Sequence, residues 1–451
     1  MICLQDRKRQ PCAFIPPKEI LEIMASLDSA WIPVLSNPLA WCYELMKSAY
    51  GLKDAPLLWY LALHAFLNTL GLKATSHEQC LYKGLAADQT DLASLTSLHV
   101  DDTLICGEES TLDEFAKQLS AKFGKVSYQK MKFTHFGVET EYDCGNTYNI
   151  KLCQRKYLQQ LKPIEINAPR GSKRTSDSPA NPDEITLFRS LISAIAWLAT
   201  TFPAAGACAS MYQSKLPVPT IGDLRQLNGL LEQLNEVYHP LIIRGDIDYR
   251  HCLIIVASDA SLGNASKYSQ VGYMVGLSQP VTTVIEFPWS LMSYKSHKSK
   301  RVATSTLHSE LLGQLSGLEE AIMLQSFLYE LAHPALSTNE LLKAAVSDLQ
   351  PIWAVTDCHD LFDTLTKSTQ PVLTNKSMTL FVEAVREYRR EGKIASFCWT
   401  DTRDNIANVL TKLTTAGLLD ITEDLIKTMR YSVWKPVHPF KTEGVLWSNE
   451  N

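Results

Sequence analysis

The stretch CLIIVAS at residues 252–258 leads directly into Asp259 and decides the fold expected for the C-terminal half of the chain. A short, continuous apolar run of this kind is typical of a strand buried on both faces of a sheet. The patterns that follow predict further strands at QVGYMVGL (270–277) and IWAVT (352–356), and helices at 305–331, 358–368, 378–392 and 404–413. This order predicts an α/β domain with helices packed on a mixed sheet.

The region before it has a different pattern. A helix-like segment at residues 57–72 and strand-like runs such as SLHVDDTLICG (97–107) predict an α+β arrangement. Residues 185–247 are mostly helical in pattern, and the segment DLRQLNGLLEQLNEVY (223–238) repeats leucine at helical intervals. The polar stretch APRGSKRTSDSPANPDE at residues 168–184 contains three prolines, which end helices, so we expect a linker there. The whole chain is therefore expected to be a multidomain protein of α+β and α/β type.

Composition excludes several classes of protein. With 451 residues, 45% of them hydrophobic and 20% charged, the chain is globular, not wholly disordered or collagen-like. The net charge of −5 does not favour a strongly basic nucleic-acid binder, so local patches would have to meet such a partner. Eleven cysteines without a CxxC pair indicate reduced thiols and an intracellular location, cytoplasmic or nuclear. Residues 190–214 carry no charge, but their proline and hydroxyl side chains favour a buried helix over a membrane span.

Two adjacent acidic residues, Asp101 and Asp102, interrupt a strand-like pattern. Neighbouring carboxylates repel each other unless a cation lies between them, so the pair is compatible with a metal site. A solvated hairpin turn explains the same two residues, and the pattern by itself favours the turn.

A second acidic set is spread along the chain. Asp259 follows CLIIVAS, Asp357 follows IWAVT, and Glu310 lies near the start of the helix predicted at 305–331. Two carboxylates at strand ends and one on a helix over the sheet can converge on one point, where they could bind two Mg²⁺ or Mn²⁺ ions for phosphodiester chemistry. The alternative is that each aspartate caps the element that follows it.

Longer motifs resemble a known family. ELMKSAYGLKDAPLLWY (44–60) and HVDDTLICG (99–107) resemble the reverse transcriptase of copia-type retrotransposons. The resemblance continues through LCQRKYLQQL and FRSLISAIAWLATTFP, and then through SDAS, HSELLG, VTDCHDLFD and DNIANVLTK, which are similar to the ribonuclease H domain of the same Pol polyprotein.

The resemblance implies a division of the chain into a partial reverse transcriptase with fingers and palm at residues 1–137, a thumb or helical connection at 138–250, a ribonuclease H-like domain at 251–415 and a C-terminal tail at 416–451. It implies that Asp101 and Asp102 are the metal-binding pair of the palm. It likewise implies that Asp259, Glu310 and Asp357 are three of four ribonuclease H carboxylates, with Mg²⁺ or Mn²⁺ as cofactor. The implied activities are RNA-directed DNA synthesis and hydrolysis of RNA in RNA/DNA hybrids.

The polymerase motifs depart from the family pattern. A third palm carboxylate would have to lie near MICLQD at the start of the sequence, and no acidic residue precedes Asp6. Asp54 and Leu57 replace a glutamine and an arginine of the motif, and leucine cannot replace the planar donors of arginine. We therefore expect the polymerase activity to be lost.

The last ribonuclease H motif also departs, because Asn408 stands where the family has the fourth carboxylate. Its amide oxygen can coordinate a cation but brings no negative charge. Asp404, one helical turn earlier, could reach the site, but we do not expect it to be an equal substitute. We expect weak or absent cleavage, and the alternative is a catalytically dead relic of the same fold that binds nucleic acid.

The segment YKSHKSKR carries four cations and no acidic residue: Lys295, Lys298, Lys300 and Arg301. They could contact the phosphates of RNA, DNA or an RNA/DNA hybrid, although such a run is also typical of a solvated surface. Tyr294 and Trp289 beside them could stack on bases or belong to the core. The resemblance also implies association with other retrotransposon proteins, and no membrane partner is expected.

Overall fold

The computed structural model describes residues 13–14, 16–40, 43–44, 52–145, 147–166, 174–262, 268–280, 287–345, 348–367, 376–436 and 440–442. These fall into two compact units. The first comprises Met1–Tyr128 with His333–Ala335, and the second comprises Gln129–Ala332 and Leu336–Asn451.

The first unit contains short helices and a small sheet, in the order β1 (Ala13–Phe14), α1 (Lys18–Leu27), η1 (Ser29–Trp31), α2 (Ile32–Ser36), η2 (Pro38–Ala40), β2 (Tyr43–Glu44), α3 (Ala55–Thr69), β3 (Lys73–Ala74), β4 (Leu81–Leu85), β5 (Leu92–His99), β6 (Asp102–Gly107) and α4 (Glu109–Phe123). The helix predicted at 57–72 is confirmed as α3. Its Leu63, Phe66 and Leu67 pack with Tyr82 and Phe115 in one core, beside the antiparallel sheet β3-β4-β5-β6.

The second unit contains β7 (Lys132–His135), β8 (Val138–Tyr142), β9 (Ile150–Cys153), α5 (Arg155–Gln160), α6 (Pro182–Leu198), α7 (Pro203–Gln213), α8 (Ile221–Val237), β10 (Leu241–Ile243), β11 (Leu253–Ser261), β12 (Gln270–Ser278), β13 (Phe287–Pro288), β14 (Ser290–Lys298), α9 (Thr306–Ala332), α10 (Thr338–Leu341), β15 (Ile352–Thr356), α11 (His359–Thr366), α12 (Lys376–Arg390), β16 (Ser396–Trp399), η4 (Ile406–Leu410), α13 (Glu423–Tyr431), β17 (Val433–Trp434) and β18 (Lys441–Thr442). The strands and helices predicted at 252–258, 270–277, 305–331, 352–356, 358–368 and 378–392 are confirmed, whereas β16 was not predicted.

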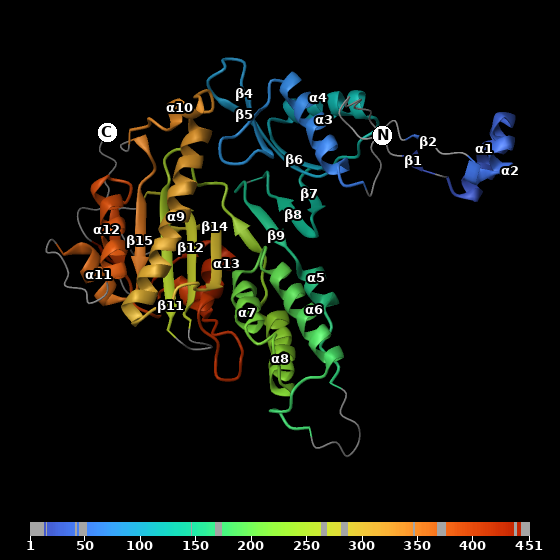
Figure 1. Ribbon diagram of the computed structural model, residues 1–451. Coiled ribbons are helices and arrows are strands. Elements are labelled where there is room, and N and C mark those ends of the chain that lie inside the picture. The colour runs from blue at the N-terminus through green and yellow to red at the C-terminus, as the bar shows by residue number, and fades with distance from the viewer. Residues whose placement is uncertain are drawn as a thin grey trace. The chain divides into compact units, whose positions relative to one another are not determined.

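The main sheet of the second unit has the strand order β14-β12-β11-β15-β16-β18. Figure 1 labels the first four of these strands. β11 pairs antiparallel with β12 and parallel with β15, and β15 pairs parallel with β16. The prediction of a mixed sheet with packed helices is therefore confirmed.

Strand β11 lies inside this sheet, and all nine of its residues are buried. Leu253, Ile255 and Ala257 face a core that they share with α6, α7 and α8, whereas Ile254 and Val256 face a core that they share with α9, α11 and α12. Successive side chains of a strand point to opposite faces, so a strand between two helical layers is apolar at every position. This is the physical origin of the run CLIIVAS.

The uncharged stretch at 190–214 forms parts of two helices, not the single buried helix that we expected. α6 ends at Leu198, and α7 begins at Pro203, whose ring is tolerated only in the first turn of a helix. Much of the stretch is buried in the core that α6, α7 and α8 share with the sheet. No helix among the described residues is both long and apolar enough to cross a membrane.

The helix predicted at 404–413 is wrong. The segment instead forms the short 3₁₀ helix η4, whose N-cap Asn405 accepts a hydrogen bond from the N–H of Ala407. Contacts with distant residues explain this difference, because side chains on both sides of η4 bind the carboxylates described below. These bonds hold the chain in a turn that a local apolar pattern does not predict.

Helices α6, α7 and α8 and the main sheet share one core within the second unit. The Tyr212 hydroxyl on α7 donates to the carbonyl of Gly417 at 3.0 Å, and the Gln270 amide on β12 donates to Ser210 on α7 at 2.9 Å. In the predicted linker, residues 168–173 lie outside the described residues, and Arg174 binds the Glu184 carboxylate through two hydrogen bonds of 2.8 and 2.6 Å. The four-part division of the chain stays a prediction.

Gly272 lets η4 lie close to β12. A Cβ atom at this position would lie 2.5 Å from Leu410 Cβ and 3.1 Å from Thr411 Cγ2. We expect Gly272→Ala to lower the free energy of unfolding by about 1–3 kcal/mol through overpacking, measured by urea denaturation. Gly229→Ala is the matched control, because its new methyl group would meet only Leu418 Cδ2 at 3.7 Å in the interior of α8. It should stabilise the protein by up to about 1 kcal/mol, and equal stability of both variants would contradict the close packing at Gly272.

Candidate metal centre

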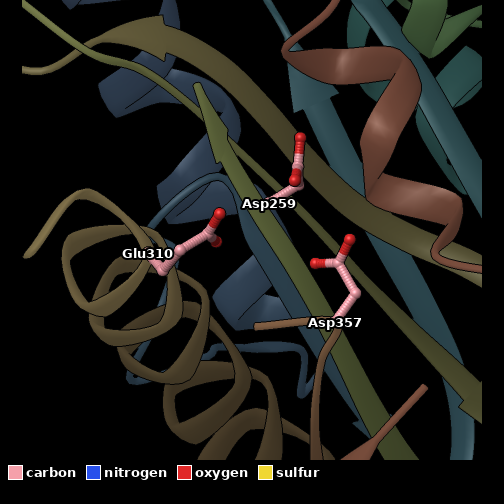
Figure 2. A group of neighbouring side chains, drawn as sticks. All are labelled: Asp259, Glu310 and Asp357. Atoms are coloured by element: carbon pink, nitrogen blue, oxygen red, sulfur yellow. The ribbon is translucent and has the colours of Figure 1, made fainter. Parts of the chain in front are cut away.

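Three carboxylates from distant parts of the chain meet at the carboxyl-terminal edge of the main sheet, toward which the parallel strands β11 and β15 run. One ligand oxygen from each of Asp259, Glu310 and Asp357 lies within 4.8 Å of the others, and their side chains point toward a common space (Figure 2). The convergence that the sequence suggested for these three residues is therefore present in the structure.

The pairing of two parallel strands explains why the aspartates meet. Ser258 of β11 lies opposite Thr356 of β15, so the residues that follow them, Asp259 and Asp357, emerge at the same edge. Helix α9 brings Glu310 over this edge and comes close to β11. A Cβ atom on Gly313 would lie 3.3 Å from the Asp259 carbonyl oxygen, so a small residue is needed there.

Burial and mutual repulsion change the proton affinity of this group. Burial raises the pKa of Asp259 from 3.8 to about 7, an effect that Lys412 opposes and Asp357 reinforces. Burial, together with the charges of Asp259 and Asp357, raises the pKa of Glu310 from 4.5 to about 9. Glu310 Oε2 is buried without a hydrogen-bond partner among the described residues. Without a cation, Asp259 and Glu310 therefore favour their protonated forms. A divalent cation could replace these protons and neutralise the carboxylates.

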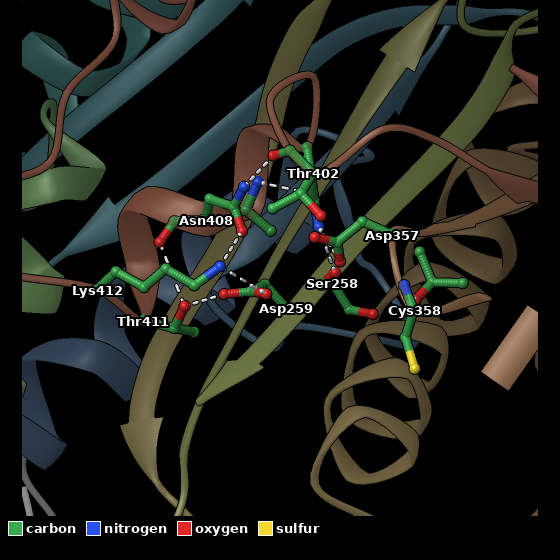
Figure 3. Close-up of polar contacts among 11 residues, drawn as sticks. Ser258, Asp259, Asp357, Cys358, Thr402, Asn408, Thr411 and Lys412 are labelled. Atoms are coloured by element: carbon green, nitrogen blue, oxygen red, sulfur yellow. Dashed lines mark hydrogen bonds and ion pairs between the residues drawn. The ribbon is translucent and has the colours of Figure 1, made fainter. Parts of the chain in front are cut away.

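Residues around η4 hold two of the three carboxylates in place (Figure 3). Asn405 Nδ2 donates to Asp357 Oδ1 at 3.0 Å and to the Ser258 carbonyl at 2.9 Å. The Thr411 hydroxyl donates to Asp259 Oδ2. Sequence reasoning did not assign roles to Asn405 and Thr411, although both lie in the DNIANVLTK motif, which was the available signal.

The two residues considered for a fourth ligand have different surroundings. Asn408 Oδ1 accepts a hydrogen bond from Lys412 Nζ at 2.7 Å, and its Nδ2 donates to the Thr402 carbonyl. Lys412 Nζ also lies 3.5 Å from Asp259 Oδ1. Asp404 is buried, and its carboxylate is not in the group of three acidic ligands found in the described part of the chain. The amide of Asn408 is thus paired with the ammonium group of Lys412.

Asp101 and Asp102 lie in a hairpin turn of the first unit. Asp102 pairs with His99 at the end of the β5-β6 ladder, both aspartates are exposed, and Val100 has a φ of +53°. The Trp59 indole donates to the Val100 carbonyl at 2.6 Å, which holds the turn. Within the described ranges, no third acidic, histidine or cysteine ligand joins the pair. Asp6 lies outside those ranges.

The four cations of the basic segment are all exposed but do not share one face: Lys295, Lys298, Lys300 and Arg301. Ser293 of β14 donates to Glu320 on α9, whereas Tyr294 donates to the Ala199 carbonyl beyond α6. By strand alternation, Lys295 lies on the α9 side and Lys298 on the α7 side. Lys298 lines a groove of about 410 Å³ between α7 and β14.

The aromatic residues near this segment serve packing. Trp289 is 2% exposed and contacts Trp434 with a ring separation of 5.4 Å. Tyr294 is half-buried against the core beside α7. Of the two roles that the sequence allowed for them, the structure favours the core.

Residues 35–168 match the family model described as reverse transcriptase (RNA-dependent DNA polymerase). This segment includes Asp101 and Asp102, and it ends before the carboxylate centre of the second unit.

Curated proteins of plant transposons are also similar to this chain. The retrovirus-related Pol polyproteins from transposons RE1 and RE2 of Arabidopsis thaliana are each 25% identical, over 303 and 307 residues, and the one from transposon TNT 1-94 of Nicotiana tabacum is 24% identical over 303 residues. Each alignment covers 64% of this chain and 19%, 20% and 22% of the relative. The chain therefore spans about a fifth of the length of the curated relatives it matches. The similarity also extends beyond the segment matched by the family model.

Proposed function

Because this chain is a relative of the copia-type retrotransposon Pol polyproteins, we propose that its carboxylate centre is a ribonuclease H-type site that hydrolyses the RNA strand of RNA/DNA hybrids. The observation that carries the proposal is the approach of Asp259, Glu310 and Asp357 to within 4.8 Å at the edge of a mixed sheet. We assign the ribonuclease H-like domain to residues 251–415, after a partial polymerase region at 1–137 and a connection at 138–250.

The residues of the centre fit a divalent cation. Carboxylate oxygens are the ligands that Mg²⁺ and Mn²⁺ prefer, and the buried Glu310 Oε2 offers an acceptor that no described protein group uses. When bound, the cation supplies charge stabilisation to the phosphodiester that is hydrolysed. Asn405 orients Asp357 and Thr411 orients Asp259, so these two ligands are positioned before substrate arrives.

An assay on an RNA/DNA hybrid tests the proposed activity. The full chain is incubated with a hybrid labelled on each strand, in Mg²⁺, in Mn²⁺ and in EDTA. We expect slow cleavage of the RNA strand that requires the cation, with the DNA strand left intact. Hybrid binding without cleavage would instead support the catalytically dead relic, which the pairing of Asn408 with Lys412 favours.

We also propose that RNA-directed DNA synthesis is lost. The exposed pair Asp101 and Asp102 lacks a third ligand among the described residues, and two metal ions are not held well by one adjacent pair. In primer extension on an RNA template, the chain should give no more product than its Asp101→Asn variant. Extension that disappears in this variant would contradict the proposed loss.

Lys298 is the cation of the basic segment that we expect to contact the hybrid most directly, because it lines the groove between α7 and β14. Replacing Lys298 with alanine should lower the slope of log affinity against log salt concentration by about 0.7–0.9, as expected for one lost phosphate contact. Fluorescence anisotropy with a labelled hybrid measures this slope. Lys343→Ala removes an exposed lysine outside the segment and should leave the slope unchanged. Equal slopes for both variants would exclude a phosphate contact at Lys298.

A further inference from the structure

The ammonium group of Lys412 lies beside the carboxylate centre, on the side of Asn408. We propose that this ammonium takes the place of the second of two metal ions, so that the centre binds a single divalent cation through Asp259, Glu310 and Asp357. The inference rests on the proposed function, because it concerns the metal content of the same site.

The contacts of Lys412 carry the first step. Its Nζ lies 2.7 Å from Asn408 Oδ1 and 3.5 Å from Asp259 Oδ1, so the ammonium occupies the space that a cation bound by both of these side chains would need (Figure 3). The Asp259 carboxylate is contacted on both oxygens, by Lys412 on Oδ1 and by Thr411 on Oδ2. Glu310 Oε2, in contrast, is buried without a hydrogen-bond partner among the described residues, so it stays available to a cation.

The orientation of Asn408 is the second step. Its Nδ2 donates to the Thr402 carbonyl, which turns Oδ1 toward Lys412 and lets the amide serve the ammonium group. A carboxylate at this position would add a negative charge and could bind a metal ion together with Asp259. The neutral amide adds none, so nothing compensates a second dication for its repulsion from Lys412.

The charge balance of the centre is the third step. Three carboxylates face one another in a largely buried site, and one dication with one ammonium matches their combined charge. A second dication would leave the site with excess positive charge, which burial makes unfavourable. The fixed ammonium therefore suits a centre with one metal ion.

The test measures Mn²⁺ binding to the full chain by isothermal titration calorimetry and by electron paramagnetic resonance, without any activity readout. We expect wild type to bind one Mn²⁺ per chain, with the spectrum of an isolated ion. The double variant Asn408→Asp with Lys412→Met should bind two Mn²⁺ ions per chain and show spin coupling, since paired metal sites lie about 3.5–4 Å apart. Lys412→Arg retains the positive charge and should keep one ion, as should Lys343→Met, an exposed control.

Lys412→Met alone should bind its single ion several-fold more tightly, because a like charge is removed. Far-UV circular dichroism identifies any variant that does not fold, and the wild-type and Lys412→Arg stoichiometries remain decisive in that case. Two ions in wild type would overturn the inference while leaving the proposed hydrolase standing, and so would a single ion in the folded double variant. No Mn²⁺ binding to wild type would overturn both the inference and the proposed metal centre.

Discussion

Replacing Asp259 with asparagine should reduce the rate of cation-dependent RNA cleavage by at least about 100-fold, since loss of metal-based charge stabilisation costs several kcal/mol in the transition state. Asp259 is 1% exposed, and its carboxylate accepts a hydrogen bond from Thr411 at the end of η4. Asparagine keeps the size of the side chain but removes the charge that a dication requires. The rate is measured on the hybrid under single-turnover conditions.

Asp360→Asn is the matched control for this change. Asp360 lies three residues after Asp357 at the start of α11, but it is exposed and is not in the group of three carboxylates. We expect this variant to cleave at the wild-type rate and both variants to bind the hybrid equally. Comparable cleavage by the Asp259 variant and wild type would show that another centre, or a contaminant, performs the reaction.

Replacing Glu310 with glutamine should stabilise the metal-free protein at alkaline pH. The pKa of Glu310 is raised by burial to about 9 and that of Asp259 to about 7, so the folded protein binds these protons more tightly than the unfolded chain does. Their contribution to stability is complete below the ordinary carboxyl pKa values near 4, and it is lost as pH rises through 7 and then 9. Wild type in EDTA should therefore unfold at a lower temperature at pH 9 than at pH 5, and glutamine at position 310 should reduce this loss.

Divalent cations should counteract the loss of stability that the metal-free protein shows as pH rises. Because a cation binds the deprotonated carboxylates, added Mn²⁺ should raise the unfolding temperature of wild type more at pH 8 than at pH 5, and it should do so less in Glu310→Gln. Glu319→Gln on the same helix is the control, since Glu319 is exposed and should leave both effects unchanged. Calorimetry at several pH values measures the shifts. An unfolding temperature of the metal-free protein that does not fall with pH would show that the centre stays charged without metal.

Much of the second unit could be predicted from local pattern. The run CLIIVAS predicted a strand buried on both faces, and β11 has such a position between two helical layers. The long amphipathic pattern predicted α9, and Asp259, Glu310 and Asp357 were selected because strand ends and a packed helix can bring carboxylates together. These inferences succeeded because side-chain periodicity records which faces of an element are buried.

Other features depended on contacts between residues far apart in the chain. The segment 404–413 has a helical pattern but forms η4, because Asn405 binds the Ser258 carbonyl and Thr411 binds Asp259, which lie 147 and 152 residues away. The opposite placement of Lys295 and Lys298 follows because residues 290–298 form the strand β14, which was not predicted. A run of like charges in a strand does not make one surface, because alternate residues leave opposite faces.

The sequence by itself determined that an acidic residue follows each of two apolar runs and that one helix carries a third acidic residue. Only the tertiary structure decided that β11 and β15 are parallel neighbours, which puts Asp259 and Asp357 side by side. It also decided that Lys412, which lies just after η4, reaches the Asp259 carboxylate. The physical reason is that the pattern of buried side chains along one segment indicates a strand, whereas the order of the strands and the position of η4 depend on how distant segments pack together in one core.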